Sequence, residues 1–125
     1  MSYRALVRSA FCFLVTLVLG ACGREAEVPR GIAGDPGRGK LLLRQYGCAS
    51  CHSIPGVATA TGNVGPPLDK IAARVYLAGV LPNTPDNMTR WILEPQKIAP
   101  LTAMPNLQVP EPHARDMVAY LYSLR

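Results

Sequence analysis

The clearest pattern of apolar and polar positions lies at the C-terminal end of the chain. Apolar side chains recur there at intervals of three and four residues, at Ala114, Met117, Val118, Leu121 and Tyr122. This spacing places them on one face of an α-helix, which turns once every 3.6 residues. The pattern predicts an amphipathic helix that continues to about residue 124 and packs its apolar face against a core.

Two further helices are predicted from their start signals. Asp35 and Thr84 are residues that cap helix N-termini, and each is followed by a proline, which suits the first helical position. These signals predict helices at about residues 36–46 and 85–93. A short helix is also expected at about residues 67–74. No segment alternates apolar and polar residues as a half-buried strand does, so the predicted fold class is all-α.

The first 21 residues have the pattern of a secretory signal peptide. Arg4 and Arg8 precede an apolar run at residues 10–19, which is too short to cross a bilayer as a permanent helix. The segment ends in the sequence LGAC, which resembles the lipobox of bacterial lipoproteins. Cys22 would then be acylated and become the first residue of the mature chain. The alternatives are ordinary signal cleavage near Cys22 and an uncleaved anchor.

The remaining length allows one small domain. Removal of residues 1–21 from a chain of 125 leaves 104 residues. Residues 22–34 contain glycine and proline and show no sustained apolar periodicity, so they are expected to be the acylated N-terminus and a flexible tether. The folded domain is expected at residues 35–125, and a monomer is expected.

The charge of the chain gives no indication of nucleic-acid binding. The full sequence carries 13 basic and 8 acidic residues, a formal charge of +5. Without Arg4 and Arg8 of the signal peptide the charge falls to +3, and the basic residues are scattered rather than clustered. Most of these charges are expected to form a solvated surface, and a weak positive rim around a functional site is the alternative.

The strongest chemical signal is the sequence CASCH at residues 48–52. The two thiols of Cys48 and Cys51 can add to the two vinyl groups of one porphyrin, and His52 can bind the iron through Nε2. The motif predicts one covalently attached haem c (heme c), whose apolar ring would form the centre of a small core. A dithiol redox pair or a zinc site is the alternative, but the other two cysteines lie in the N-terminal segment.

From about residue 34 to residue 125 the chain resembles a class I cytochrome c. The landmarks follow the family order: a first helix, CASCH, GPPL at residues 65–68, a middle helix, a methionine loop and a last helix. The chain is particularly similar to the cytochrome c domain of subunit II of caa3-type oxidases, through VLPNTPDN at residues 80–87 and WILEPQ at residues 91–96. It lacks the copper-binding domain of such subunits, so a free-standing, lipid-anchored relative is expected.

The iron needs a second axial ligand besides His52. Met104 lies in a loop 52 residues after His52, where the resemblance puts the ligand, and a loop lets the thioether approach the iron from the distal side. Met88 and Met117 lie on predicted helices and are more simply core residues. His113 is expected to be an exposed residue in the first turn of the last helix. An open iron site is the remaining alternative.

The resemblance implies roles for further residues around the haem. The carbonyl of Pro66 would accept the Nδ1 proton of His52 and increase its donor strength, and Leu68 would pack on the ring. Three more contacts are implied: Trp91 beside the methionine ligand, Thr102 near a propionate and Arg74 paired with a propionate. Core packing alone is the alternative for Trp91, and a solvated helix end is the alternative for Arg74.

Gly39 is expected to mark the closest approach of the first and last predicted helices. A glycine allows two helix backbones to come near each other, so Gly39 and Leu43 are expected to contact the region of Ala119 and Tyr120. This contact would be structural.

Two classes of function fit a c-type haem. A haem peroxidase or gas sensor needs an open iron position and distal acid–base groups, for which the sequence offers only His113. We therefore expect a one-electron carrier, not an enzyme, on the periplasmic side of a bacterial membrane. The expected partners are a terminal oxidase or a quinol-oxidising complex, and the alternative is a periplasmic dehydrogenase that donates electrons.

Overall fold

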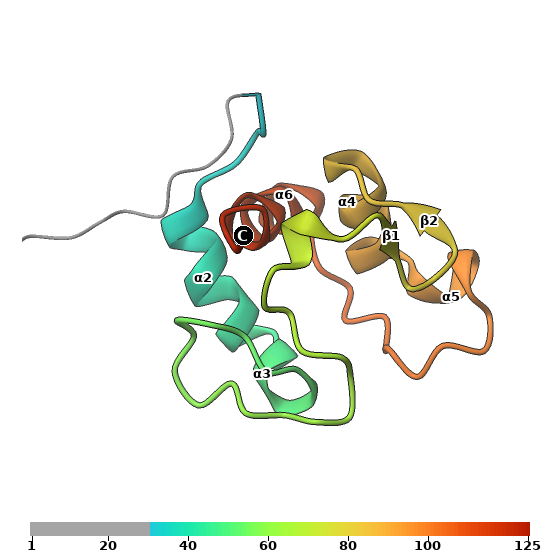
Figure 1. Cartoon of the computed structure of the whole chain (residues 1–125), viewed down its shortest axis with the longest axis horizontal. Helices are drawn as coiled ribbons and strands as arrows, with labels where there is room; N and C mark the ends of the chain where they lie inside the picture. The colour runs from blue at the N-terminus through green and yellow to red at the C-terminus, as the bar shows by residue number, and fades with distance from the viewer. Residues whose placement is uncertain (1–30) are drawn as a thin grey trace, which may run out of the picture.

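The computed structural model describes residues 31–125. The predicted signal peptide, Cys22 and most of the predicted tether lie outside this range. The described part is mostly helical, and its largest contact between elements joins α2 (Pro36–Gln45) to α6 (Glu111–Leu121) (Figure 1). No helix within residues 31–125 is long and apolar enough to span a membrane.

Helix α2 begins and ends as its sequence predicts. The Asp35 carboxylate accepts a hydrogen bond from the backbone N–H of Arg38 at 3.0 Å, and Pro36 occupies the first helical position. Tyr46 caps the C-terminus, and Gly47 follows it in the left-handed region at φ +77°. The helix buries one face, formed by Gly39, Leu42 and Leu43. It ends at Gln45, so its predicted range of 36–46 is confirmed to within one residue.

The close approach of α2 and α6 takes place at Gly39. A Cβ atom added there would lie 1.9 Å from the carbonyl oxygen of Asp116 and 2.9 Å from the backbone nitrogen of Met117. The backbone that meets Gly39 is therefore about one turn before the expected contact at Ala119 and Tyr120, and that expectation was wrong in position.

Asp116 is a buried carboxylate that joins α6 to the start of α2. Its side chain is 2% exposed, and both of its oxygens accept hydrogen bonds from the Arg38 guanidinium, one of them from Nη2 at 2.9 Å. The backbone N–H of Asp35 donates to the same carboxylate at 2.8 Å. A buried charge is stable only when it is paired and hydrogen-bonded, and Asp116 meets both conditions.

Asp116→Asn is expected to destabilise the folded protein by about 1.5–3 kcal/mol at neutral pH, because charge-assisted hydrogen bonds have about this value. The hydrogen bond from Arg38 holds the pKa of Asp116 below its usual range. The stabilisation is therefore present above the unfolded-state pKa and is lost as the pH falls through the lowered pKa. Denaturant unfolding should show a gap between wild type and variant at pH 7 that narrows toward pH 3. A gap that stays constant with pH would contradict this assignment.

The predicted helix at residues 67–74 was wrong. Only Ile71–Ala73 forms a helical turn, the 3-10 helix η1. The backbone N–H of Leu68 donates to the carbonyl of Ser53 at 2.8 Å, and Lys70 adopts a left-handed φ of +49°. The left-handed Lys70 interrupts a continuous α-helix, whereas the bond of Leu68 alone would not, because N–H groups in the first turn of a helix have no partner within it.

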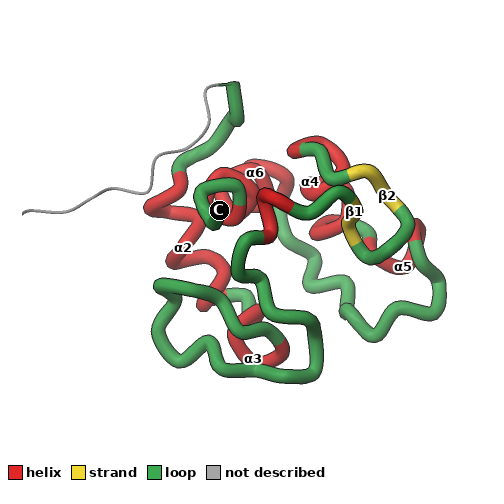
Figure 2. The backbone as a smooth tube through the Cα atoms, in the orientation of Figure 1, coloured by secondary structure: helices red, strands yellow, loops and turns green. Residues whose placement is uncertain are grey.

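The chain after η1 forms a hairpin and the helices α4, α5 and α6 (Figure 2). Strands β1 (Tyr76–Leu77) and β2 (Leu81–Pro82) pair antiparallel, with Leu77 opposite Leu81. Strands of two residues are too short to show alternation, so the sequence analysis missed them. Helix α4 (Pro85–Leu93) confirms its prediction, with Thr84 as its cap, and α5 (Pro95–Ile98) follows. Helix α6 ends at Leu121, before the predicted residue 124.

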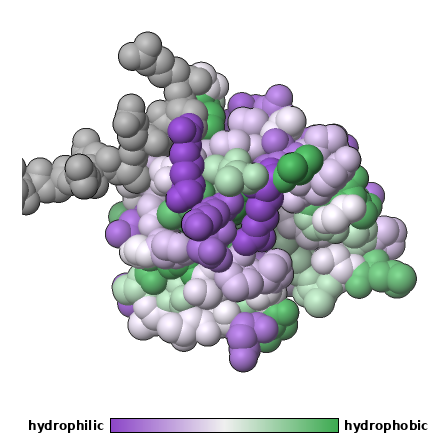
Figure 3. Space-filling model, in the orientation of Figure 1, coloured by the Kyte–Doolittle hydropathy of each residue, from purple (hydrophilic) through white to green (hydrophobic). Residues whose placement is uncertain are grey.

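The core lies between α2, α4 and α6. Met88 and Met117 are 2% and 0% exposed, which confirms that both are core residues. Apolar side chains also remain at the surface among hydrophilic ones (Figure 3). The most exposed of the large ones are Leu101, Val75, Val64 and Leu41.

Candidate haem site

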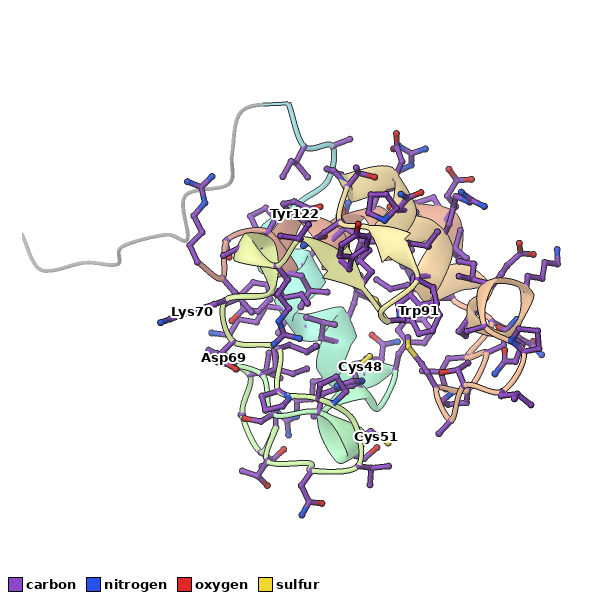
Figure 4. The ribbon with its side chains drawn as sticks, turned by 45° about the vertical axis from the view of Figure 1, so that its right-hand side comes forward. Cys48, Cys51, Asp69, Lys70, Trp91 and Tyr122 are labelled. Atoms are coloured by element: carbon purple, nitrogen blue, oxygen red, sulfur yellow. The ribbon has the colours of Figure 1, made fainter. Side chains whose placement is uncertain are left out.

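The two motif cysteines lie on one helical turn, α3 (Cys48–Cys51), directly after α2 (Figure 4). Gly47 allows the turn to start because it takes a left-handed conformation that other residues rarely adopt. Both thiols are partly buried, and their positions three residues apart place them on the same side of the helix. The sequence analysis did not predict this turn.

The geometry disfavours the alternative readings of the cysteines. Burial raises the pKa of the Cys48 thiol, whereas a redox-active dithiol needs a lowered one. Within residues 31–125 no group of three or more His, Cys, Asp or Glu side chains could hold a metal ion such as zinc.

His52 is oriented by a backbone carbonyl. Its Nδ1 lies 2.7 Å from the carbonyl oxygen of Pro66, and because a carbonyl can only accept, Nδ1 carries the proton and donates it. This hydrogen bond selects the tautomer in which Nε2 has its lone pair available for a metal. The pairing of His52 with Pro66 is the one expected from the resemblance.

Residues 62–68 form a strap that lies against the motif. The N–H of Gly65 donates to the carbonyl of Cys51 at 2.8 Å. A Cβ atom on Gly65 would lie 2.3 Å from Cε1 of His52, and one on Gly62 would lie 2.5 Å from the carbonyl oxygen of Ser50. Both positions therefore require glycine. The sequence analysis missed Gly62, which no motif in the sequence marks.

Met104 lies in the loop between α5 and α6 and is partly buried. Its backbone is held from two sides: its N–H donates to the Thr102 hydroxyl at 3.2 Å, and Gln96 donates to its carbonyl at 2.7 Å. The Thr102 hydroxyl thus contacts the backbone of Met104, and its expected place near a propionate stays a prediction. Gln96 was missed as a site residue, although it belongs to the sequence WILEPQ.

The other expected site residues lie on elements around the motif. Leu68 is partly buried against the core, and Trp91 is partly buried on α4 (Figure 4). The Arg74 guanidinium donates to the carbonyls of Pro67 and Asp69, the latter at 3.2 Å. Its expected pairing with a propionate stays a prediction. Arg74 lies at the C-terminal end of η1, and its side-chain bonds are exposed, so the alternative of a helix-end residue also stays open.

His113 differs from its expectation. It is partly buried rather than exposed, and its Nδ1 lies 2.9 Å from the hydroxyl of Tyr46 at the end of α2. The two rings meet edge to face at 5.9 Å. Because Met88 and Met117 are also buried in the core, Met104 is the candidate ligand that a loop presents.

The segments that carry the expected ligands can offer apolar surface to a large group. The two loops that carry the expected ligands hold apolar side chains at the surface: Val64 is 74% exposed, Leu101 is fully exposed and Leu107 is 37% exposed. Partly buried thiols, an oriented imidazole and these apolar side chains together match what a covalent haem requires.

No protein-family model matches the chain. It is 34% identical over 108 residues to cytochrome c2 of Rhodopila globiformis, an alignment that covers 74% of this chain and 95% of that protein. The chain belongs to the class I cytochromes c. The chain is an electron-transfer protein with covalently bound haem c, and its Cys48 and Cys51 have the spacing of the attachment motif.

A second relative is a longer protein than this chain. The chain is 31% identical over 106 residues to cytochrome c oxidase subunit 2 of Alkalihalophilus pseudofirmus, an alignment that covers 82% of this chain. The matched region spans about 30% of the length of that relative.

Proposed function

We propose that this cytochrome is a lipid-anchored carrier that delivers single electrons to a terminal oxidase, with its iron bound by His52 and Met104. The main support for the oxidase as acceptor is the likeness to an oxidase subunit over 82% of the chain.

The haem supplies an iron that alternates between the ferric and ferrous states. The protein adjusts this equilibrium through the atoms that hold the iron. The hydrogen bond from His52 to Pro66 strengthens the imidazole as a donor, and the thioether of Met104 favours the ferrous state and raises the potential relative to a second histidine. The bond from Gln96 to the Met104 carbonyl and the bond from the Met104 N–H to Thr102 fix this backbone, which limits rearrangement between the two oxidation states.

The anchor would be the acyl chains on Cys22. Each buried CH₂ group contributes roughly 0.8 kcal/mol to membrane binding, so several chains hold the protein stably. A flexible chain of about twelve residues, the length of the expected tether, spans roughly 20 Å. This length keeps the domain at the periplasmic membrane surface, where an oxidase would dock.

Charge steering of the encounter is expected to be weak. Lys70, Lys97 and Arg44 are exposed and could face an acidic partner, but Lys97 is already paired with Glu94. Exposed charges are screened over about 8–10 Å at 0.1–0.15 M salt. The tether, more than the charges, would then supply the local concentration.

The experiment compares the full chain with Cys22→Ser in oxidase-containing membranes over a salt series. Mass spectrometry of the membrane fraction should find a mature chain that begins at acylated Cys22. At equal low concentration the anchored form should sustain faster oxidase turnover, with a shallow salt dependence and the same reduction potential as the soluble form. Equal turnover would refute the role of the anchor. If neither form reduces the oxidase and a periplasmic dehydrogenase reduces both forms, the dehydrogenase replaces the oxidase as the proposed partner.

A further inference from the structure

We propose that Tyr122, Asn83 and Arg74 are positioning residues that hold the Pro66 carbonyl against His52 and thereby help to set the reduction potential. The inference rests on the ligation by His52 in the proposed function. It assigns Arg74 a task within the protein in addition to any contact with a propionate.

Asn83 is the centre of this network. Its side-chain amide donates to the carbonyls of Ile71 and Arg74, each at 2.8 Å, and its oxygen accepts from the hydroxyl of Tyr122 at 2.9 Å. Its backbone N–H donates to Val75 at 2.9 Å. Through its side chain and its backbone N–H, Asn83 thus joins η1, the start of the hairpin and the end of α6.

Arg74 continues the network toward the histidine. While Asn83 holds its backbone carbonyl, its guanidinium donates to the carbonyls of Pro67 and Asp69. Pro67 directly follows Pro66, whose carbonyl receives the Nδ1 proton of His52. A rigid two-point clamp on the next carbonyls limits how far the Pro66 oxygen can move from the imidazole.

The conformation of the clamped loop shows why it needs support. Lys70, next to the clamped Asp69, has a left-handed φ of +49°, which is unfavourable for a residue with a side chain. Such conformations persist where the surroundings hold them. The hydrogen bonds from Arg74 to the Asp69 carbonyl and from Asn83 to the Ile71 carbonyl hold this loop on both sides of Lys70.

Tyr122 connects the network to the most extensively packed part of the protein. It caps the C-terminus of α6 and is 9% exposed. Figure 4 labels Tyr122 and Asp69, which mark the two ends of the network. The N–H of Ala72 also donates to the carbonyl of Leu124 at 3.3 Å, so η1 is tied to the C-terminal segment twice. The network therefore links the position of the Pro66 carbonyl to α6.

Helix α6 also offers a matched control. Tyr120 is 6% exposed and donates its hydroxyl to the carbonyl of Pro55 at 2.6 Å, outside this network. Tyr122→Phe and Tyr120→Phe each remove one hydroxyl and one hydrogen bond from the same helix without changing charge. They should lower stability to a similar extent.

The test measures two properties of the purified holoproteins: the midpoint potential and, by NMR of the reduced form, the exchange rate of the His52 Nδ1 proton. A looser carbonyl weakens the imidazole as a donor, which favours ferrous iron. Tyr122→Phe should shift the ratio of reduced to oxidised protein about threefold toward reduced, which is about 30 mV at 59 mV per tenfold, and speed proton exchange. Tyr120→Phe should change neither property.

Arg74 separates the network from a propionate effect. Arg74→Gln should speed Nδ1 exchange at least as much as Tyr122→Phe, and Arg74→Lys should partly restore slow exchange, since the ammonium can still donate to a carbonyl. Equal behaviour of the Tyr122→Phe and Tyr120→Phe proteins would overturn the inference. A wild-type spectrum without histidine ligation would instead overturn the proposed function, so the two failures are distinguishable.

Discussion

Replacement of Met104 by alanine is expected to open the sixth position of the haem iron. Wild-type protein in the reduced state should bind carbon monoxide slowly or not at all, because the proposed thioether ligand would occupy the site. Loss of this competitor should raise the apparent affinity for carbon monoxide by about 100-fold or more, which corresponds to about 2.8 kcal/mol at 1.4 kcal/mol per tenfold.

Optical spectra measure this directly. Oxidised wild-type protein should show the weak near-infrared band of methionine-bound ferric haem, and Met104→Ala should lose it. Met88→Leu is the control, because Met88 is 2% exposed in the core and leucine has a similar volume. It should keep the band and exclude carbon monoxide. Rapid carbon monoxide binding by the wild type would weaken the carrier function in favour of a peroxidase or gas sensor.

Gly39→Ala is expected to prevent the accumulation of stable holoprotein. The new Cβ would lie 1.9 Å from the carbonyl oxygen of Asp116 and 2.5 Å from its carbon, and both atoms belong to helix backbone. The clash can be relieved only if α2 and α6 separate, which would also disturb the Arg38–Asp116 pair. Overpacking usually costs about 1–3 kcal/mol, and a backbone clash of this depth should reach or exceed the upper end.

The same helix contains the control. In Gly37→Ala the nearest atom to the new Cβ would be the side-chain Oδ1 of Asp35 at 3.3 Å. Alanine is favoured over glycine in a helix by roughly 0.5–1 kcal/mol, so this variant should be as stable as wild type or slightly more stable. Holoprotein yield and denaturant unfolding would compare the two. Similar stability of both variants would show that the helix contact at Gly39 can relax.

Local sequence signals determined the helices that have them. Asp35 and Thr84 each accept a hydrogen bond from the N–H three residues later, as N-terminal caps do, and α2 and α4 begin where these residues predict. The periodic apolar face of α6 predicted the burial of Ala114, Met117, Val118 and Leu121, but not that of Asp116, Ala119 and Tyr120. These signals act over one or two turns, so they can be read without knowledge of the rest of the fold.

The chemistry of the site was equally accessible from the sequence. The order and spacing of Cys48, Cys51 and His52 are set by the covalent geometry of a haem and its iron, whatever fold surrounds them. The family resemblance implied that the Pro66 carbonyl accepts the Nδ1 proton of His52, and in the structure these two atoms are 2.7 Å apart. The roles of Met104, Thr102 and Arg74 toward the haem remain predictions.

Only the tertiary structure decided which distant residues meet. Arg38 and Asp116 are 78 residues apart, and Tyr46 and His113 are 67 apart. Gly62, Asn83 and Gln96 each lie in segments without periodicity, where no local preference indicates a partner. The region at 67–74 forms only the short turn η1, because Lys70 is left-handed and the N–H groups of Leu68 and Ala72 bond to Ser53 and Leu124 in other segments. Such pairings depend on the packing of α2 against α6, and their energy appears only after the whole chain has folded.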